Sequence, residues 1–243
     1  MSIESAISIA NSGLANVANG FTVISQNVAN ASTPGYAREI ASQETVTADG
    51  LGMGVRTLPT TRAVDAVLAQ GILDQNAAVG SLTTQQTALT AIDAVQGTPG
   101  QGQDLASTLG ALRDAFSTLG VDPSNQTEAA AVVTAAGKLS QSVNSLAQAY
   151  GVQRQGAQDA IVAGVKSINT ELSAIGGLNT QIIALRAVGQ STADLEGQRD
   201  AALQSLSQVI DIKTVPAANG DLAVYTATGL VLPTQGGSAS QLT

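Results

Sequence analysis

The 243-residue chain is 44% hydrophobic but only 2% aromatic, so small aliphatic side chains would form its core and disorder over the whole length is excluded. It has no histidine and no cysteine, so catalysis by imidazole or thiolate, disulfides and zinc–thiolate sites are all excluded. The sequence therefore predicts a protein that is not an enzyme and that has no cofactor or metal. The net charge of −8 and the ten dispersed basic residues exclude the basic stripe needed for nucleic acid or an anionic membrane surface.

A ladder of apolar residues with alternating steps of four and three opens the chain. This spacing places one apolar stripe along a helix from about Ile3 to Val28, as in a coiled coil. The other side carries Ser, Asn, Thr and Gln. Because such a stripe needs a partner, we expect an assembly interface. Its residues are Ile3, Ile7, Leu14, Val17, Phe21, Ile24 and Val28, with Ala10 in the same register.

A helix stop and a tight turn follow the ladder, so the first predicted segment is an N-terminal helix and turn over residues 1–36. Pro34 disfavours helical backbone at the residue before it. Residues 37–60 are predicted as an extended linker or loop. Within them, Thr45-Val46-Thr47 suits a strand, and the glycine-rich stretch 50–55 is expected to be a flexible or tightly turned loop.

Residues 61–210 are predicted to form an elongated helical domain. The longest expected helix has about 60 residues, roughly 90 Å at 1.5 Å per residue. Glycines at 151, 156, 164, 176 and 177 predict bends or a break in it. The predicted helices cover residues 61–96, then 104–120 with Asp104 as N-cap, then 127–185, and finally 191–209.

After residue 210 the pattern changes to period two, around a turn at Asn219-Gly220. Residues 211–243 are therefore predicted as the start of a β-containing domain, apparently truncated. The expected fold is mainly α: an elongated bundle of long coiled-coil-like helices, with a short extended or β segment after the first helix and a small antiparallel β-hairpin near the C-terminus.

Residues 27–38, Asn-Val-Ala-Asn-Ala-Ser-Thr-Pro-Gly-Tyr-Ala-Arg, resemble the N-terminal signature Asn-x-x-Asn-x-x-Thr-Pro-Gly-(Tyr/Phe) of the flagellar axial proteins, which comprise rod, hook and hook-associated proteins. Tyr36 followed by Arg38 resembles the hook-associated members most. The matching positions are Asn27, Asn30, Thr33, Pro34, Gly35, Tyr36 and Arg38. Two further stretches are similar to the family: Gly52 to Gln70, which includes Arg62-x-x-Asp65, and Leu195-x-x-Gln198-Arg199-Asp200.

The resemblance implies the N-terminal portion of a structural subunit at the junction between hook and filament, needed for filament assembly. It implies export through the flagellar type III apparatus without a cleaved signal peptide, and an extracellular location. The implied partners are further copies in a ring or helical tube, the hook protein, the next hook-associated protein and an export chaperone. The apolar stripe would pack on a C-terminal helix and on neighbouring subunits, and the polar side of the same helix would face the channel or an adjacent protein. Arg38 would meet an inter-chain carboxylate or carbonyl.

Two alternatives stay open from the sequence. Another axial protein, of hook or rod, would carry the same signature, although the long helical region disfavours a hook protein because the family's hook proteins are mainly β in their outer parts. A type III-secreted coiled-coil effector or translocator would need an apolar membrane-inserting stretch, and the sequence offers none.

Overall fold

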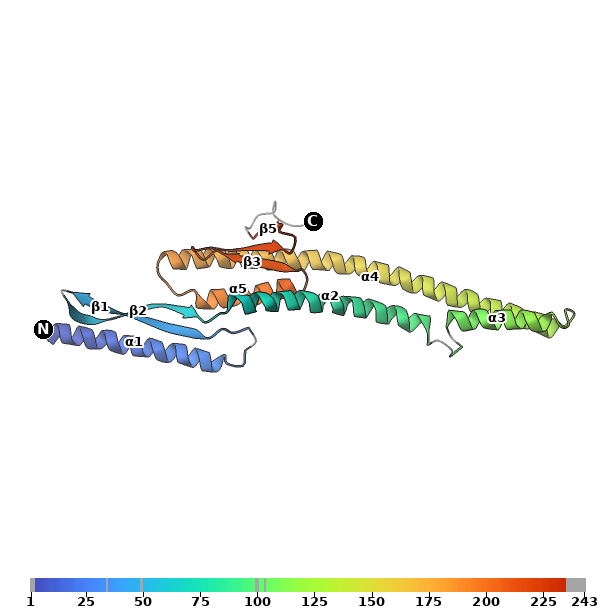
Figure 1. The fold of residues 1–243 in the computed structure, drawn as a ribbon, viewed down its shortest axis with the longest axis horizontal. Coiled ribbons are helices and arrows are strands. Elements are labelled where there is room, and N and C mark those ends of the chain that lie inside the picture. The colour runs from blue at the N-terminus through green and yellow to red at the C-terminus, as the bar shows by residue number, and fades with distance from the viewer. Residues whose placement is uncertain (1–2, 34, 49, 99–100, 103, 235–243) are drawn as a thin grey trace. The chain divides into compact units, whose positions relative to one another are not determined.

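The computed structural model describes residues 3–33, 35–48, 50–98, 101–102 and 104–234. It divides into two compact units, Met1–Gly80 with Val165–Thr243 and Ser81–Gly164. The described part is mainly α-helical with a small antiparallel sheet near the C-terminus, as predicted (Figure 1). The elements are α1 (Ile3–Ala29), β1 (Glu39–Ala48), β2 (Leu51–Arg62), α2 (Ala66–Gln96), α3 (Leu105–Leu119), α4 (Gln126–Ala187), α5 (Ala193–Ser207), β3 (Ile212–Pro216), β4 (Leu222–Thr226) and β5 (Val231–Leu232).

Strands β1 and β2 form an antiparallel hairpin that covers one side of α1. These strands agree with the extended or β segment expected after the first helix, whereas the flexible or tightly turned loop expected at 50–55 is strand over residues 51–55. The register shifts where Val46 pairs with Gly54 and Thr47 with Gly52, which marks a bulge. Gly54 has a φ of +118°, and a Cβ there would collide with Ser12. Its missing side chain thus lets the bulged strand approach α1.

Helix α2 begins later than the predicted residue 61, because β2 continues to Arg62 and Asp65 caps the helix. The backbone N–H groups of Val67 and Leu68 donate to Asp65 Oδ1 at 2.9 and 3.0 Å. The end of α2 at Gln96 matches the prediction, and Gly97 follows with a φ of +77°.

The core of the first unit lies between α2, α4, α5 and the sheet of order β3-β4-β5. The predicted turn at Asn219-Gly220 connects β3 to β4, and β5 completes a meander. Each of these elements contributes at least one buried apolar side chain. The buried cluster is Leu73, Ile168, Leu172, Ile175, Leu203, Leu206, Ile212, Leu222, Val224 and Leu232.

Helix α4 is one continuous element of 62 residues, so the predicted break is absent from it. Gly176 permits a close approach instead. A Cβ at this residue would collide with the backbone carbonyl of Thr234, so only a residue without a side chain lets the chain pass this part of α4.

In the second unit, α3 begins as predicted, with Asp104 as N-cap. Its Oδ1 accepts from the backbone N–H of Ser107 at 2.9 Å and its Oδ2 accepts from the Ser107 hydroxyl at 2.6 Å. The helix ends before Gly120, also as predicted. Apolar side chains in this unit are mostly exposed, including Leu109, Phe116 and Val152, whereas Val132 is 9% exposed.

Candidate functional site

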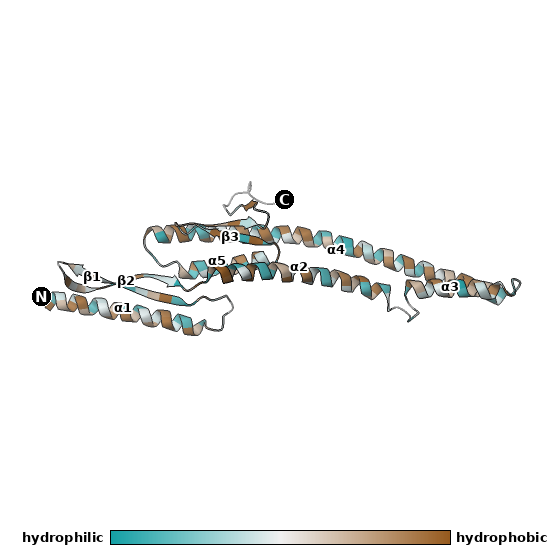
Figure 2. Cartoon of the chain, viewed as in Figure 1, coloured by the Kyte–Doolittle hydropathy of each residue, from teal (hydrophilic) through white to brown (hydrophobic). Residues whose placement is uncertain are grey.

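All seven residues of the predicted interface on α1 are exposed, by fractions between 53% (Val17) and 80% (Ile3). Figure 2 shows apolar and polar residues interleaved along this helix. The described part of the chain therefore leaves the stripe uncovered. An apolar face of seven large side chains in water is what an assembly surface requires.

The opposite side of α1 lies on the hairpin. Val23 is 5% exposed, and the Ser12 hydroxyl accepts a hydrogen bond from the backbone N–H of Val55 at 3.2 Å. The Thr57 hydroxyl donates to Asn16 Oδ1 at 3.4 Å. At 3.6 residues per turn, Ser12, Asn16 and Val23 share a side that points away from the stripe. Ser12 and Asn16, on the polar side that the resemblance places towards a channel or an adjacent protein, are thus engaged within the chain, whereas Ser8 and Gln26 are exposed.

Asn27 fastens the end of α1 to the start of β1. Its Nδ2 donates to the carbonyl of Glu39 at 2.9 Å, and its Oδ1 accepts from the N–H of Glu39 at 2.8 Å. The same Oδ1 accepts from the hydroxyl of Tyr36 at 2.9 Å. This motif position is therefore a structural hub, with three hydrogen bonds on one amide.

The remaining turn residues order the chain between these two elements. The N–H and hydroxyl of Thr33 donate to the carbonyl and Oδ1 of Asn30 at 2.9 and 3.3 Å, and the N–H of Tyr36 donates to the Thr33 carbonyl at 3.1 Å. Gly35 has a φ of +80°, a backbone that favours glycine. Pro34 lies outside the described residues. The side chain of Arg38 is exposed, and its carbonyl accepts from the N–H of Ala63 at 2.9 Å.

The turn holds two ionisable side chains whose pKa values are shifted. Burial raises the pKa of Glu39 above its ordinary value, the negative charge of Asp194 raises it further, and Arg62 opposes both. Burial also raises the pKa of the Tyr36 phenol, with Glu39 adding to the effect. Tyr36 is thus a neutral hydrogen-bond donor to Asn27 at physiological pH.

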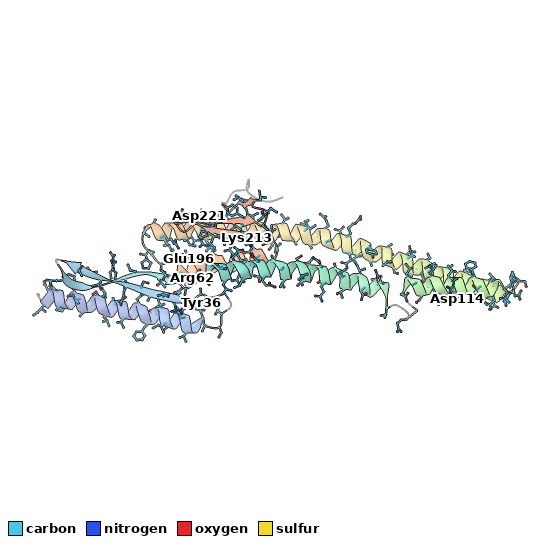
Figure 3. The ribbon with its side chains drawn as sticks, viewed as in Figure 1. Tyr36, Arg62, Asp114, Glu196, Lys213 and Asp221 are labelled. Atoms are coloured by element: carbon cyan, nitrogen blue, oxygen red, sulfur yellow. The ribbon has the colours of Figure 1, made fainter. Side chains whose placement is uncertain are left out.

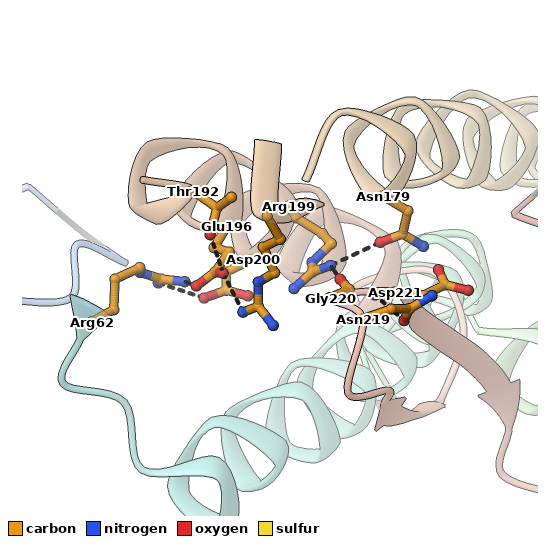
Figure 4. Close-up of polar contacts among 10 residues, drawn as sticks. Arg62, Asn179, Thr192, Glu196, Arg199, Asp200, Asn219, Gly220 and Asp221 are labelled. Atoms are coloured by element: carbon orange, nitrogen blue, oxygen red, sulfur yellow. Dashed lines mark hydrogen bonds and ion pairs between the residues drawn. The ribbon is translucent and has the colours of Figure 1, made fainter. Parts of the chain in front are cut away.

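Arg62, at the end of β2, reaches two carboxylates of α5, as the close-up in Figure 4 shows; Figure 3 labels Arg62 and Glu196 within the whole chain. Its Nη2 lies 2.6 Å from Asp200 Oδ2, and its Nη1 lies 3.9 Å from Glu196 Oε2. Glu196 Oε1 also accepts from Arg186 at 2.8 Å and from the Thr192 hydroxyl at 2.7 Å. Burial works against ionisation of Glu196, but these hydrogen bonds and the neighbouring cations outweigh it and lower its pKa.

Arg199, at the centre of the predicted Gln198-Arg199-Asp200 motif, is 7% exposed and holds the β3–β4 turn. Its Nη1 donates to Asn179 Oδ1 and to the carbonyl of Gly220, each at 2.8 Å. Asn179 Nδ2 donates to the carbonyl of Leu222 at 2.9 Å. Burial lowers the pKa of the guanidinium, and the charges of Glu196 and Asp200 counteract this effect. Within the motif, Arg199 is buried and stabilises the β3–β4 turn, Asp200 is the ion-pair partner of Arg62, and Gln198 is exposed.

Two residues of these networks had no assigned role from the sequence. Arg62 was quoted only as part of a resemblance, and Glu196 was missed. One signal was available for Glu196: it stands four residues before Asp200 on a predicted helix, so both carboxylates share a face.

Two negative findings apply to the described residues. Because the sequence has no histidine and no cysteine, only acidic side chains could form a metal site of the usual kind. Among the described residues, no group of three or more of them is placed to hold a metal ion. No helix among these residues combines the length and apolar character needed to cross a membrane.

Comparison with known proteins gives a consistent set of matches. The family model described as the flagellar hook-associated protein FlgK helical domain matches residues 89–243. The chain is 28% identical to flagellar hook-associated protein 1 of Bacillus subtilis over 218 residues, which cover 84% of this chain and 43% of that protein. It is also 28% identical to flagellar hook-associated protein 1 of Salmonella typhimurium over 251 residues, which cover 99% of this chain and 44% of that protein.

Among solved structures, the flagellar hook junction protein FlgK from Burkholderia pseudomallei matches with a TM-score of 0.60 and 22% identity, over 68% of this chain and 28% of that one. This likeness concerns the fold. The chain spans less than half the length of the curated relatives that it matches.

Proposed function

The chain belongs to the family of the flagellar hook-associated protein FlgK helical domain, and from this membership we propose that it acts as a structural, non-enzymatic subunit of the bacterial flagellum, at the junction between hook and filament. The membership agrees with the resemblance carried by residues 27–38. In this role the chain supports filament assembly by binding other subunits rather than by catalysing a reaction.

The single observation that carries the proposal is the exposed stripe of α1. Burying a large aliphatic or aromatic side chain contributes roughly 1.5–3 kcal/mol, so seven of them can drive a stable association. The polar side of the helix is already bonded to the hairpin, which leaves the apolar side for the partner. We propose that the partner surface is a helix of matching apolar spacing, within a ring or helical tube of identical subunits.

Further partners follow from the same role. They are the hook protein on one side, the next hook-associated protein on the other, and an export chaperone before assembly. The proposed location is the extracellular flagellum, reached through type III export without a cleaved signal peptide. Arg38, whose side chain is exposed at the base of the turn, is proposed to meet a carboxylate or carbonyl of another subunit.

The sequence alternatives are less well supported. A hook or rod protein would share the turn motif, but the matched relatives bear the name of hook-associated protein 1. A secreted effector or translocator that inserts into membranes gains no support from the helices of the described region.

The test is to place a charge on the stripe in the native protein. Leu14→Asp and Phe21→Asp should abolish hook-tip incorporation and swimming, because a carboxylate would be buried in an apolar contact. Thr22→Asp is the matched control, since Thr22 is an exposed neighbour of Phe21 off the stripe. Export of all variants is checked in the culture medium. Normal motility with Leu14→Asp or Phe21→Asp would refute the assembly role of the stripe.

A further inference from the structure

Within the first unit, α1, β1 and β2 form an N-terminal body. A very short link joins it to α2. Ala63 still belongs to the N-terminal body, because its N–H donates to the carbonyl of Arg38 at 2.9 Å. Asp65 already belongs to α2, because it caps that helix. Val64, which is 46% exposed, is therefore the one residue between the two.

A single free residue with two soft backbone dihedrals would let the N-terminal body turn. The ion pair of Arg62 with Asp200 lies next to this link and ties the body to α5. The Arg62 side chain is 7% exposed, so salt screens its ion pair with Asp200 far less than it screens a pair on the surface. The backbone at Gly35 also lies close to this helix, since a Cβ added there would be 3.3 Å from Gln204 Nε2.

The surroundings of α5 favour the ion pair. Arg186 and Thr192 hold Glu196 in its ionised form, so Arg62 faces two carboxylates one helical turn apart. Removing Arg62 would leave Asp200 without this counter-charge. Removing the charge of Asp200 would leave a buried guanidinium with only the more distant Glu196, at 3.9 Å. Each change should therefore destabilise the contact between the N-terminal body and α5 more than the loss of a surface ion pair would.

We infer that Arg62 and Asp200 form a latch across a hinge at Val64, which fixes the direction in which the apolar stripe of α1 leaves the helical part of the first unit. This inference concerns the conformation of the free chain and does not depend on a flagellar role. With the latch closed, the N-terminal body holds one orientation against α5. With the latch broken, the body turns about Val64 while α1 and its hairpin stay folded together.

The absence of cysteine from the sequence makes a distance measurement straightforward. Spin labels are attached to Ala15→Cys on α1 and Ser173→Cys on α4, two exposed positions of the first unit. Double electron–electron resonance on the full chain should then give one narrow distance peak. Arg62→Met, which keeps an unbranched apolar chain in place of the aliphatic part of arginine and removes the charge, should broaden or split this peak. Asp200→Asn should do the same with almost no change in volume.

The matched control is Arg56→Met. Arg56 pairs with Glu44 at 2.6 Å inside the hairpin, so it is the same residue type in an ion pair that does not cross the hinge. The control should leave the peak narrow. A second label pair within the N-terminal body, Ala15→Cys with Thr45→Cys, should stay narrow in every variant and so exclude unfolding of the body. An unchanged peak in both Arg62→Met and Asp200→Asn, or equal broadening in Arg56→Met, would overturn the latch.

Discussion

The side-chain amide of Asn27 pairs with the backbone of Glu39 as a neighbouring strand would, donating to its carbonyl at 2.9 Å and accepting from its N–H at 2.8 Å. Glu39 is 7% exposed, so these backbone groups have little access to water. The amide satisfies them at the point where the chain leaves the helix and enters the sheet. This contact gives the first asparagine of the turn motif a physical role.

Asn27→Ala should therefore destabilise the N-terminal body by about 1–3 kcal/mol, because two buried backbone groups and the Tyr36 hydroxyl lose their partner. Amide exchange of Glu39 and urea unfolding measure the effect. Asn11→Ala serves as the control, since Asn11 is an exposed asparagine of the same helix. Equal stability of the two variants would show that the Asn27 pairing contributes nothing.

Gly220→Ala should destabilise the first unit by more than about 1 kcal/mol. Gly220 has a φ of +95°, and a Cβ there would lie 2.7 Å from Arg186 Cδ and 2.9 Å from Ile182 Cγ2. Gly177→Ala is the contrasting control, because Gly177 is helical and has no atom within 4 Å of the added carbon. That change should stabilise α4 by up to about 1 kcal/mol. Thermal unfolding of both variants measures the difference, and shifts of the same sign would contradict the geometry.

The success and the failure of sequence reasoning have different physical causes. The stripe of α1 was predictable because its spacing is local and periodic. Strand β2 was not, since Gly52, Gly54 and Pro59 all disfavour strands and only the pairing with β1 and the contact with α1 stabilise it. Local propensity is overruled here by contacts that no window of the sequence contains.

The same reason explains the missed networks. Gln70 closes the free edge of β3, donating to the carbonyl of Ile212 at 2.8 Å and accepting from the N–H of Thr214 at 3.2 Å. The partners stand more than 140 residues apart in the chain. The pairing of Arg62 with Asp200 spans 138 residues. Each residue looks like an ordinary polar position of a helix or strand until the fold brings its partner to it.

Two glutamates should give opposite pH dependence. The raised pKa of Glu39 means that the folded chain binds its proton more tightly than the unfolded chain, so the protonated form stabilises below the ordinary carboxyl pKa and this contribution is lost as the pH rises through the raised value. The lowered pKa of Glu196 has the reverse effect: its contribution is present above the ordinary pKa and is lost as the pH falls through the lowered value.

Glu39→Gln should therefore raise the free energy of unfolding at neutral pH, and Glu196→Gln should lower it. The deficit of Glu196→Gln should shrink in acid, where the wild-type carboxylate is itself protonated. Urea unfolding at neutral and acidic pH measures both. A destabilised Glu39→Gln at neutral pH would mean that the Glu39 carboxylate has a favourable partner that outweighs its burial.

The last prediction concerns α1 in the unassembled chain. This helix has 27 residues, and Val23 is its single buried apolar side chain in the described region, whereas the 15 residues of α5 bury Leu203 and Leu206 at 4% and 0% exposure. Helical amides are protected in proportion to the packing that resists local opening, and most helical stability in proteins comes from tertiary packing of an amphipathic face. The amides of α1 should thus exchange with solvent much faster than those of α5, as measured by hydrogen exchange with mass spectrometry. Covering the stripe should slow them, whereas a monomer in which α1 is already protected as strongly as α5 would mean that the helix needs no partner.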